Sequence, residues 1–332
     1  MAIFPTQYST LSAAALGRYV EEQYGLSRLQ CRFLLRGVSD TYVLEGATEK
    51  YILKIYRDVH RSLEEIKGEL ELLNVLHREG CKVSYPISDK TDNQLQAFEA
   101  AEGTRYGILF SYALGSPVYK PTDEQLTITG QEMARIHNIT AAITLNHPRA
   151  TYNHHTTLLH PIKILEPAFT ELPDEYRYLQ ETAAAVIKKL DSIDTSGFSY
   201  GYCHYDFMPK NFHFDEHNNI TFFDFDFAGK GFLVNDLMSY WIHYAMYFVL
   251  GRLSREEADR AFNIFVDAYR TLRPISQAEI DAIPYLNFGF WVFYLGFYQE
   301  QFDDFSTHFF NNHFKKERVA LMKKIMDAYC PL

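Results

Sequence analysis

The chain has 332 residues, a length that accommodates about two domains of ordinary size. Hydrophobic residues make up 47% and charged residues 22%, and Gly and Pro are scarce at 17 and 12, which excludes disordered, collagen-like and low-complexity proteins. The formal net charge of −10 disfavours a nucleic-acid partner, because binding a phosphate backbone requires an excess of cations.

The cysteines and the apolar stretches indicate a reduced, cytoplasmic protein that does not enter a membrane. The four cysteines lack the spacing of a metal site or of a disulfide framework: Cys31, Cys81, Cys203 and Cys330. The first residues contain neither the basic nor the apolar part of a secretory signal. The stretches 237–250 and 283–298 are short for a membrane span, and each contains a polar residue, so buried helices are expected there.

The first part of the chain has the pattern of a small antiparallel sheet with one main helix beside it. Short runs rich in β-branched and aromatic residues alternate with turn residues, and apolar residues three or four apart follow them. The expected elements are a helix over 9–24, strands over 32–36, 41–44 and 50–56, a helix over 62–79, and strands over 96–99 and 106–112.

Beyond residues 111–117 the pattern changes to long helices that one strand hairpin interrupts. Helices are expected over 122–138, 173–191, 233–250, 255–271, 277–302 and 313–329, and the hairpin over about 211–225. We therefore predict an α+β fold of two unequal lobes, a mostly β lobe over 1–112 and a mostly helical lobe over 113–332. A short strap joining two lobes would leave a natural cleft between them.

The hairpin carries the strongest chemical signal. If Phe214 lies opposite Thr221, then Asn211 lies opposite Asp224, because opposed residues share one face of a hairpin. An amide oxygen and a carboxylate side by side suit Mg²⁺, which takes hard oxygens together with substrate phosphates. Asp206 precedes Asn211 by five residues and brings a second carboxylate, which can accept a proton from an attacking hydroxyl.

Asp226 follows Asp224 by two residues and would share its face if the strand continued. Two roles are open for Asp226: it binds a second metal ion, or it only supports the site.

A second polar pair is predicted in the first lobe. Lys54 lies within an apolar strand, where its ammonium group needs an anion. Glu69 falls inside the apolar stripe of the helix that follows, whereas Glu71 points nearly opposite. We expect Lys54 and Glu69 to form an ion pair of the kind that orients a lysine on nucleotide phosphates.

Together these residues resemble the protein-kinase-like small-molecule phosphotransferases, the group of aminoglycoside phosphotransferases, choline kinases and type II homoserine kinases. The resemblance runs from about residue 30 to 245. The family's H-G-D-x-x-x-x-N loop matches His204-Tyr-Asp206-Phe-Met-Pro-Lys-Asn211, and its I-D-[WF]-[ED] segment matches Phe223-Asp224-Phe225-Asp226. Its D-L-A helix start matches Asp236-Leu-Met, and its L-x-x-L-H helix matches Gln131-Glu-Met-Ala-Arg-Ile-His137.

The resemblance implies a bilobal protein-kinase-like fold and the use of ATP and Mg²⁺. It makes Asp206 the catalytic base, assigns Mg²⁺ to Asn211 and Asp224, and places Lys54 on the α- and β-phosphates, oriented by Glu69. The γ-phosphate of ATP would pass to a hydroxyl of a small metabolite. An amino alcohol such as homoserine, an aminoglycoside and a sugar-like compound all remain open as the acceptor.

The resemblance also implies an adenine site on the segment that links the lobes. The carbonyl of Ser111 and the N–H of Ala113 would contact the adenine edge, and Phe110 would stand at the gatekeeper position. Ser39 belongs to the loop over 37–41 that would cover the phosphates, and His204 would brace the metal segment rather than react.

Four features depart from the family or from protein kinases. Tyr205 replaces a usual glycine, and Lys210 brings a cation close to the γ-phosphate. The phosphate loop lacks G-x-G-x-x-G, and Asp236 follows Asp224 by only twelve residues, too few for a peptide-docking segment. These last two features argue against a protein kinase.

Two alternatives remain: a metal-dependent hydrolase that uses the same acids, and a non-catalytic, pseudokinase-like nucleotide-binding module. Substrate recognition is expected in the helical lobe after residue 235. Its candidates are the aromatic segment 285–298 and the acids Glu300, Asp303 and Asp304. The substrate and the oligomeric state are not determined by the sequence.

Overall fold

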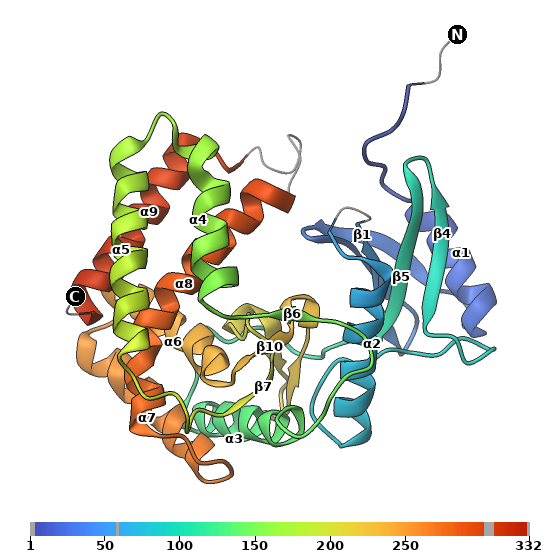
Figure 1. Cartoon of the computed structure of the whole chain (residues 1–332). Helices are drawn as coiled ribbons and strands as arrows, with labels where there is room; N and C mark the ends of the chain where they lie inside the picture. Colours follow the sequence, from blue (N-terminus) through green and yellow to red (C-terminus); the bar gives the residue numbers. More distant parts are fainter. Residues whose placement is uncertain (1–3, 58–59, 302–308, 331–332) are drawn as a thin grey trace. The chain divides into compact units, whose positions relative to one another are not determined.

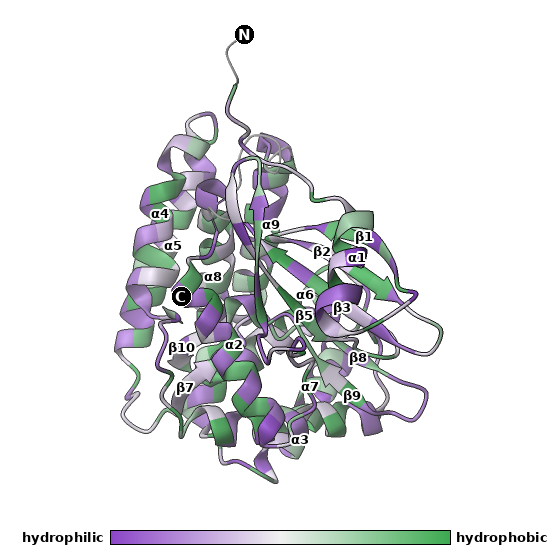
Figure 2. Ribbon diagram, turned by 90° about the vertical axis from the view of Figure 1, so that its right-hand side faces the viewer, coloured by the Kyte–Doolittle hydropathy of each residue, from purple (hydrophilic) through white to green (hydrophobic). Residues whose placement is uncertain are grey.

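The computed structural model describes residues 4–57, 60–301 and 309–330. They fall into two compact units (Figure 1). The first comprises 1–115 with the short segments 145–148 and 221–223, and the second comprises 116–144, 149–220 and 224–332. The mixture of an antiparallel sheet with many helices confirms the predicted α+β class. Hydropathy colouring shows helices of mixed character, α5 (Pro173–Asp191) among them, and the more uniformly apolar α8 (Gln277–Gln301) (Figure 2).

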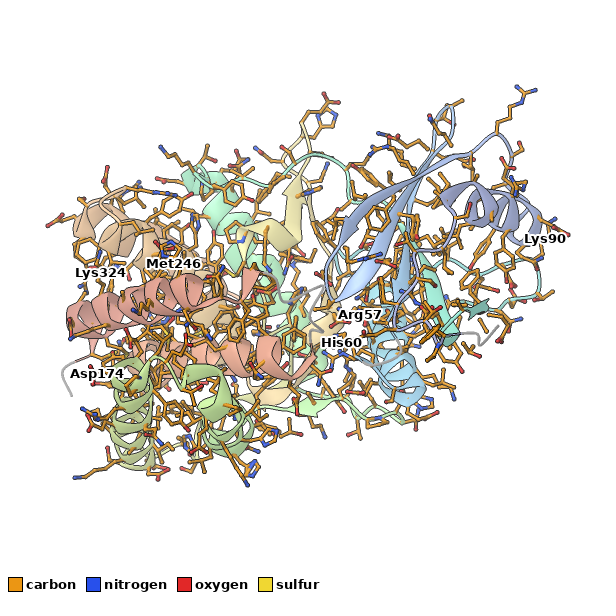
Figure 3. The ribbon with its side chains drawn as sticks, turned by 90° about the horizontal axis from the view of Figure 1, so that it is seen from above. Arg57, His60, Lys90, Asp174, Met246 and Lys324 are labelled. Atoms are coloured by element: carbon orange, nitrogen blue, oxygen red, sulfur yellow. The ribbon has the colours of Figure 1, made fainter. Side chains whose placement is uncertain are left out.

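The first unit is a five-stranded antiparallel sheet in the order β1-β2-β3-β5-β4. The expected elements are all present: α1 (Ala13–Tyr24), β1 (Gln30–Arg36), β2 (Ser39–Glu45), β3 (Lys50–Tyr56), α2 (Leu63–Arg78), β4 (Leu95–Ala100) and β5 (Gly103–Ser111). β3 leads into Arg57, and His60 donates its N–H to the Arg57 carbonyl; both side chains are buried (Figure 3).

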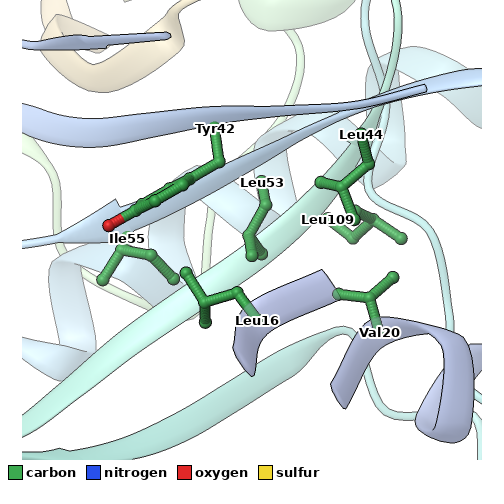
Figure 4. Close-up of a cluster of buried hydrophobic side chains, with 7 residues drawn as sticks. All are labelled: Leu16, Val20, Tyr42, Leu44, Leu53, Ile55 and Leu109. Atoms are coloured by element: carbon green, nitrogen blue, oxygen red, sulfur yellow. The ribbon is translucent and has the colours of Figure 1, made fainter. Parts of the chain in front are cut away.

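One face of this sheet packs on α1. Seven buried side chains form the core between them: Leu16, Val20, Tyr42, Leu44, Leu53, Ile55 and Leu109 (Figure 4). The strand residues alternate along β2 and β3, so that one side of each strand faces this core. α1 ends at Gly25, which adopts a φ of 71° that favours glycine.

Helix α2 begins with a reciprocal cap. Ser62 Oγ accepts the Glu65 N–H, and the Glu65 carboxylate accepts the Ser62 N–H at 3.0 Å. The helix buries Glu69 on the same side as Ile66 and Leu73, as its apolar stripe predicts.

The second unit is mainly helical, and all six of its predicted helices are present. They are α3 (Asp123–Thr140), α5 (Pro173–Asp191), α6 (Val234–Val249), α7 (Arg255–Arg270), α8 (Gln277–Gln301) and α9 (Asn312–Tyr329). α6 and α8 are largely buried, and α8 packs against α4 (His160–Leu165), α5, α6 and α9. In the described part of the chain, no helix combines the length and the apolar character needed to cross a membrane.

The sequence did not predict two parts of this unit. One is a helical segment that contains a π-helical turn (His155–Leu159) and α4 (His160–Leu165). The other is a three-stranded sheet in the order β6-β10-β7, built from β6 (Ala150–Thr151), β7 (Tyr200–Cys203) and β10 (Gly229–Phe232). These strands have two to four residues, too few to show a period of two.

Helices α3 and α7 meet closely at Gly130. A Cβ added there would overlap the Phe265 carbonyl oxygen and lie 3.0 Å from the Tyr269 nitrogen, both backbone atoms that cannot turn aside. We expect Gly130→Ala to destabilise the protein by about 1–3 kcal/mol, because overpacking outweighs the roughly 1 kcal/mol that alanine contributes to helix propensity. Thermal or denaturant unfolding measures the difference.

Gly197 provides the matched control for this prediction. A Cβ at Gly197 meets no atom within 4 Å. Gly197→Ala should therefore leave the free energy of unfolding within about 0.5 kcal/mol of its original value. Equal stabilities of the two variants would contradict the tight packing of α3 on α7.

Candidate active site

The loop that follows β7 holds the predicted catalytic segment in an unusual backbone conformation. Tyr205 has a φ of 68°, in the left-handed region that favours glycine. Its ring is buried and stacks on Tyr152 with the ring centroids 3.5 Å apart and the planes within 3°. This stacking gives a physical reason for a tyrosine where the resemblance implies a glycine: packing of the ring offsets the backbone strain.

Asp236, at the start of α6, anchors this loop. Its carboxylate accepts the backbone N–H of His204 at 2.8 Å and that of Tyr205 at 2.6 Å. The same carboxylate lies 3.0 Å from His137 Nε2, and His137 Nδ1 lies 2.8 Å from the Tyr269 hydroxyl. The chain Tyr269–His137–Asp236 is buried and therefore fixes the loop to α3, α6 and α7.

Asp206 follows directly and is 2% exposed. One of its oxygens, Oδ2, accepts Asn211 Nδ2 at 2.8 Å and Lys210 Nζ at 2.7 Å. The other, Oδ1, is buried and has no hydrogen-bond partner among the described residues. The carboxylate is thus held through one oxygen, and the second is available to accept a proton from a hydroxyl group.

The side chain of Lys210, the cation beside Asp206, is half exposed. Burial would by itself lower the pKa of Lys210, but the charge of Asp206 and the hydrogen bond to it outweigh that effect and raise the pKa. Lys210 is therefore charged at neutral pH and lies next to the predicted base, whereas its predicted closeness to the γ-phosphate stays a prediction.

The hairpin register differs from the prediction by one residue. The Asp215 N–H donates to the Asn219 carbonyl at 3.0 Å, and Asn218 has a φ of 59°. Phe214 consequently lies opposite Ile220 rather than Thr221, and both of these side chains are buried. The three-residue turn with a left-handed residue sets this register, and the alternation of residues alone did not reveal the turn.

Asn211 and Asp224 lie outside the strands of this hairpin, which are β8 (Phe212–Phe214) and β9 (Ile220–Phe222). Asn211 ends a 3-10 turn, and Asp224 has a φ of 64°. The prediction that the two residues lie directly opposite each other across the hairpin is therefore wrong. Loop conformation positions each of them instead.

Asp226, like Asp224, lies outside the strand β9. A 3-10 turn (Phe225–Phe227) replaces the continued strand, so Asp224 and Asp226 do not share a strand face. Asp226 is fully buried, whereas Asp224 is exposed. The question of a second metal ion at Asp226 stays open.

Arg149 holds this turn together, and sequence reasoning did not identify it. Its guanidinium donates to three carbonyls, those of Phe225 at 3.0 Å, Asp226 at 2.5 Å and Ala228 at 2.7 Å. The ring of His204 also packs on Phe225, with the centroids 4.4 Å apart. Contacts from two directions therefore brace the turn that begins at Asp224. An isolated arginine in a loop carries no sequence signal for such a role.

The chemistry of the donors fits Mg²⁺. Asn211 Nδ2 is committed to the Asp206 carbonyl and carboxylate, which leaves the amide oxygen for a cation. Asp224 adds an exposed carboxylate. No cluster of three or more His, Cys, Asp or Glu side chains suited to a metal occurs within residues 4–57, 60–301 and 309–330. A magnesium site needs fewer protein ligands than that, because substrate phosphates and waters complete its shell.

In the first unit, Lys54 Nζ lies 3.3 Å from Glu69 Oε1, and both residues are buried. The predicted ion pair is therefore present. Glu69 Oε2 is buried without a hydrogen-bond partner in the described chain. Their assigned role, contact with nucleotide phosphates, stays a prediction.

The predicted adenine contacts lie on and after β5. Ser111 belongs to the strand, and its carbonyl accepts Ser84 Oγ at 2.6 Å, which leaves one lone pair for another donor. Phe110 and Ala113 are both buried. Ser39 opens β2, and its buried Oγ has no hydrogen-bond partner among the residues described. Contact of these residues with the nucleotide stays a prediction.

Comparison with known proteins identifies the chain's relatives. The model of a family described as "Phosphotransferase enzyme family" matches residues 30–277. An uncharacterised protein of Deinococcus radiodurans is 30% identical over 304 residues, 92% of this chain and 87% of that protein. A homoserine kinase of Phenylobacterium zucineum is 26% identical over 272 residues, 79% of this chain and 76% of the kinase.

Among solved structures, the fold is similar to that of an amicoumacin kinase in complex with AMP-PNP, Ca²⁺ and Ami. The TM-score is 0.73, and the match covers 96% of this chain and 94% of that one at 18% identity.

Proposed function

The chain belongs to the phosphotransferase enzyme family and is a small-molecule kinase, and from this premise we propose that it transfers the γ-phosphoryl group of ATP to an alcohol of a small metabolite. The observation that carries the proposal is the state of Asp206. Asn211 and Lys210 hold one of its oxygens, and the other is buried without a partner in the described chain.

In the proposed reaction, Asp206 Oδ1 accepts the proton of the acceptor hydroxyl as the hydroxyl oxygen attacks the γ-phosphorus. The bond between the γ-phosphorus and the β–γ bridging oxygen breaks, and ADP leaves with that oxygen. The hydrogen bonds to Oδ2 hold the carboxylate in place during this transfer. Lys210, which donates to the other oxygen of the same carboxylate, provides positive charge beside the phosphoryl group.

The proposal also assigns partners to the nucleotide phosphates. Lys54, oriented by Glu69, neutralises the α- and β-phosphates. Asn211 and Asp224 would hold Mg²⁺, which offsets the negative charge of the phosphates when it is bound. The rest of the nucleotide is proposed to contact Ser111, Ala113, Phe110 and Ser39.

The two alternatives explain fewer of these contacts. A metal-dependent hydrolase would use Asp206 and Asp224, but this hypothesis assigns no function to the buried Lys54–Glu69 pair. A pseudokinase-like module would give no task to the unpartnered oxygen of Asp206. The kinases among the chain's relatives favour phosphoryl transfer over both alternatives.

Nucleotide binding tests the proposal. The protein should bind ATP in the presence of Mg²⁺, and Lys54→Met should weaken that binding about tenfold to a hundredfold, because a charge-assisted hydrogen bond is lost. Isothermal titration calorimetry measures both affinities. ADP release should also rise with at least one acceptor from a panel of amino alcohols, hydroxy amino acids, aminoglycosides and sugars.

Lys67→Met is the control, because Lys67 lies on α2 and pairs with Glu64 at the surface. It should leave ATP affinity unchanged. If the unaltered protein bound no ATP with Mg²⁺ present, the proposed function would be wrong.

A further inference from the structure

Helix α8 carries a row of buried polar side chains on one face. Asn287, Trp291 and Tyr294 are spaced by four and three residues, which places them above one another along the helix. They are only 1%, 7% and 8% exposed. Both amide atoms of Asn287, Trp291 Nε1 and the Tyr294 hydroxyl lack a hydrogen-bond partner in the described part of the chain. Since buried polar atoms are nearly always hydrogen-bonded, three such residues in a row point to a ligand.

A cation from α9 lies on this row. The Arg318 guanidinium is 4.3 Å from the centroid of the Trp291 ring and 5.2 Å from that of Phe314. No described carboxylate lies within ion-pairing distance of it. Burial lowers the pKa of Arg318, and only Tyr298 opposes that effect. The guanidinium is thus partly removed from water, and no described residue provides the anion that usually accompanies it.

The four groups share one chemical character. Arginine and the indole N–H donate hydrogen bonds and cannot accept them, and the tyrosine hydroxyl and the asparagine amide each add a donor. A donor set with a positive charge matches a group of anionic oxygens. A carboxylate fits it, since guanidinium and carboxylate groups form paired hydrogen bonds.

The row leads toward the predicted base. Tyr298 follows Tyr294 by four residues on the same face of α8. The pKa of Tyr298 is raised, mainly by burial, and Arg318, Lys210 and Asp206 all act on it electrostatically. The pKa of Tyr294 is raised by burial first and next by the charge of Asp206. Both hydroxyls therefore lie within electrostatic reach of Asp206, and Tyr298 lies within reach of Arg318 as well.

We propose that Arg318, together with Trp291 and Tyr294, binds a carboxylate on the acceptor, so that the substrate is a hydroxy acid or a hydroxy amino acid. The inference rests on the proposed function, because it assumes that a hydroxyl of the bound molecule reaches Asp206. The donor set then selects the molecule, and Asp206 acts on it.

This arrangement disfavours a purely cationic acceptor. A positive group would face Arg318 without an intervening anion. Of the acids considered for substrate binding, Glu300 is half exposed and lies 3.8 Å from His160, whereas Asp303 and Asp304 lie outside the described residues.

Trp291 itself reports on binding, because the chain has only two tryptophans. In a Trp241→Phe background, Trp291 emission should change saturably on titration with at least one hydroxy amino acid from homoserine, serine and threonine. The matched compounds 3-amino-1-propanol, ethanolamine and 1-amino-2-propanol differ only by the missing carboxylate. Each should bind at least about tenfold more weakly than its partner.

Variants in the same background locate the contact. Arg318→Gln should weaken binding of the hydroxy amino acid about tenfold to a hundredfold, and Tyr294→Phe, which removes only a hydroxyl, should weaken it several-fold. Lys324→Gln removes an exposed cation from the same helix and should have no effect. In the kinase assay, Arg318→Gln should raise the KM of the carboxylate-bearing acceptor and leave ATP affinity unchanged.

Three results would overturn the inference. Two come from the emission titrations: no saturable change with any of the three hydroxy amino acids, or equal affinity for the decarboxylated partners. The third is a loss of ATP affinity in Arg318→Gln, which would assign the guanidinium to the nucleotide. If Arg318→Gln did not fold, Tyr294→Phe would provide the same comparison. The emission titrations contain no ATP, so failure of ATP binding in the unaltered protein would count against the proposed function and not against carboxylate recognition.

Discussion

Asp206→Asn should reduce the turnover of acceptor phosphorylation by about 10²–10⁴-fold, the range lost when a positioned acid–base group is removed. The substitution keeps the size of the side chain, and its amide oxygen can still accept a hydrogen bond from Asn211 or Lys210, which now meet at Oδ2. What disappears is the basicity of Oδ1, the oxygen that has no partner in the described chain. Steady-state kinetics with saturating ATP and acceptor measure the effect.

ATP affinity and folding decide how this result is interpreted. Both should remain close to those of the unaltered protein, because Asp236 and not Asp206 holds the backbone of the loop. Asp174→Asn, at an exposed position in the first turn of α5 (Figure 3), is the control for removal of one negative charge and should be neutral. Equal losses of ATP affinity and turnover in Asp206→Asn would make Asp206 a metal ligand or a structural residue instead of a base.

Asp224→Asn should abolish the dependence of ATP affinity on Mg²⁺ and reduce turnover by about a hundredfold or more. A metal ion contributes several kcal/mol of charge stabilisation, and each 1.4 kcal/mol or so corresponds to a factor of ten in rate. Asparagine is preferable to alanine in this test, because Asp224 has a φ of 64° and asparagine tolerates the left-handed region. ATP titrations with and without Mg²⁺ measure the effect.

Asp226→Asn separates the two acids of this segment. Asp226 is fully buried next to carbonyls that Arg149 holds, so its loss should chiefly lower the melting temperature. If only the Asp226 variant lost the Mg²⁺ effect, the assignment of Asp224 as the metal ligand would be wrong. If both variants lost it, Asp226 would take part in metal binding as well.

Local patterns sufficed for most elements of the fold. The long helices α3 and α5–α9 have at least four turns each, and the sequence predicts α8 from its long apolar run and most of the others from their apolar periodicity. The strands β1–β3 are predictable because turn residues separate their short runs of β-branched and aromatic residues. The sheet β6-β10-β7 was missed because its strands are short and distant in sequence, so that pairing and not composition defines them.

Residue identity and spacing also identified the candidate site. A charged residue in an apolar stripe or strand needs a partner, which is why the pairing of Lys54 with Glu69, fifteen residues later, could be predicted from residue types and helical period alone. Asp206, Asn211 and Asp224 stood out through their joint spacing. The predicted register, in which Asn211 lies opposite Asp224, is wrong because one left-handed residue, Asn218, shifts the pairing by one position.

The sequence by itself determined the α+β class, the family and the identity of the acids and the lysine expected to do the chemistry, since these depend on side-chain type and local period. Only the tertiary structure decided which oxygen of Asp206 is left unpartnered among the described residues, that Arg149 holds the turn after Asp224, and that Arg318 lies on Trp291. These facts join residues that are far apart in sequence. Their physical cause is the packing of helices and loops on one another, which no local pattern encodes.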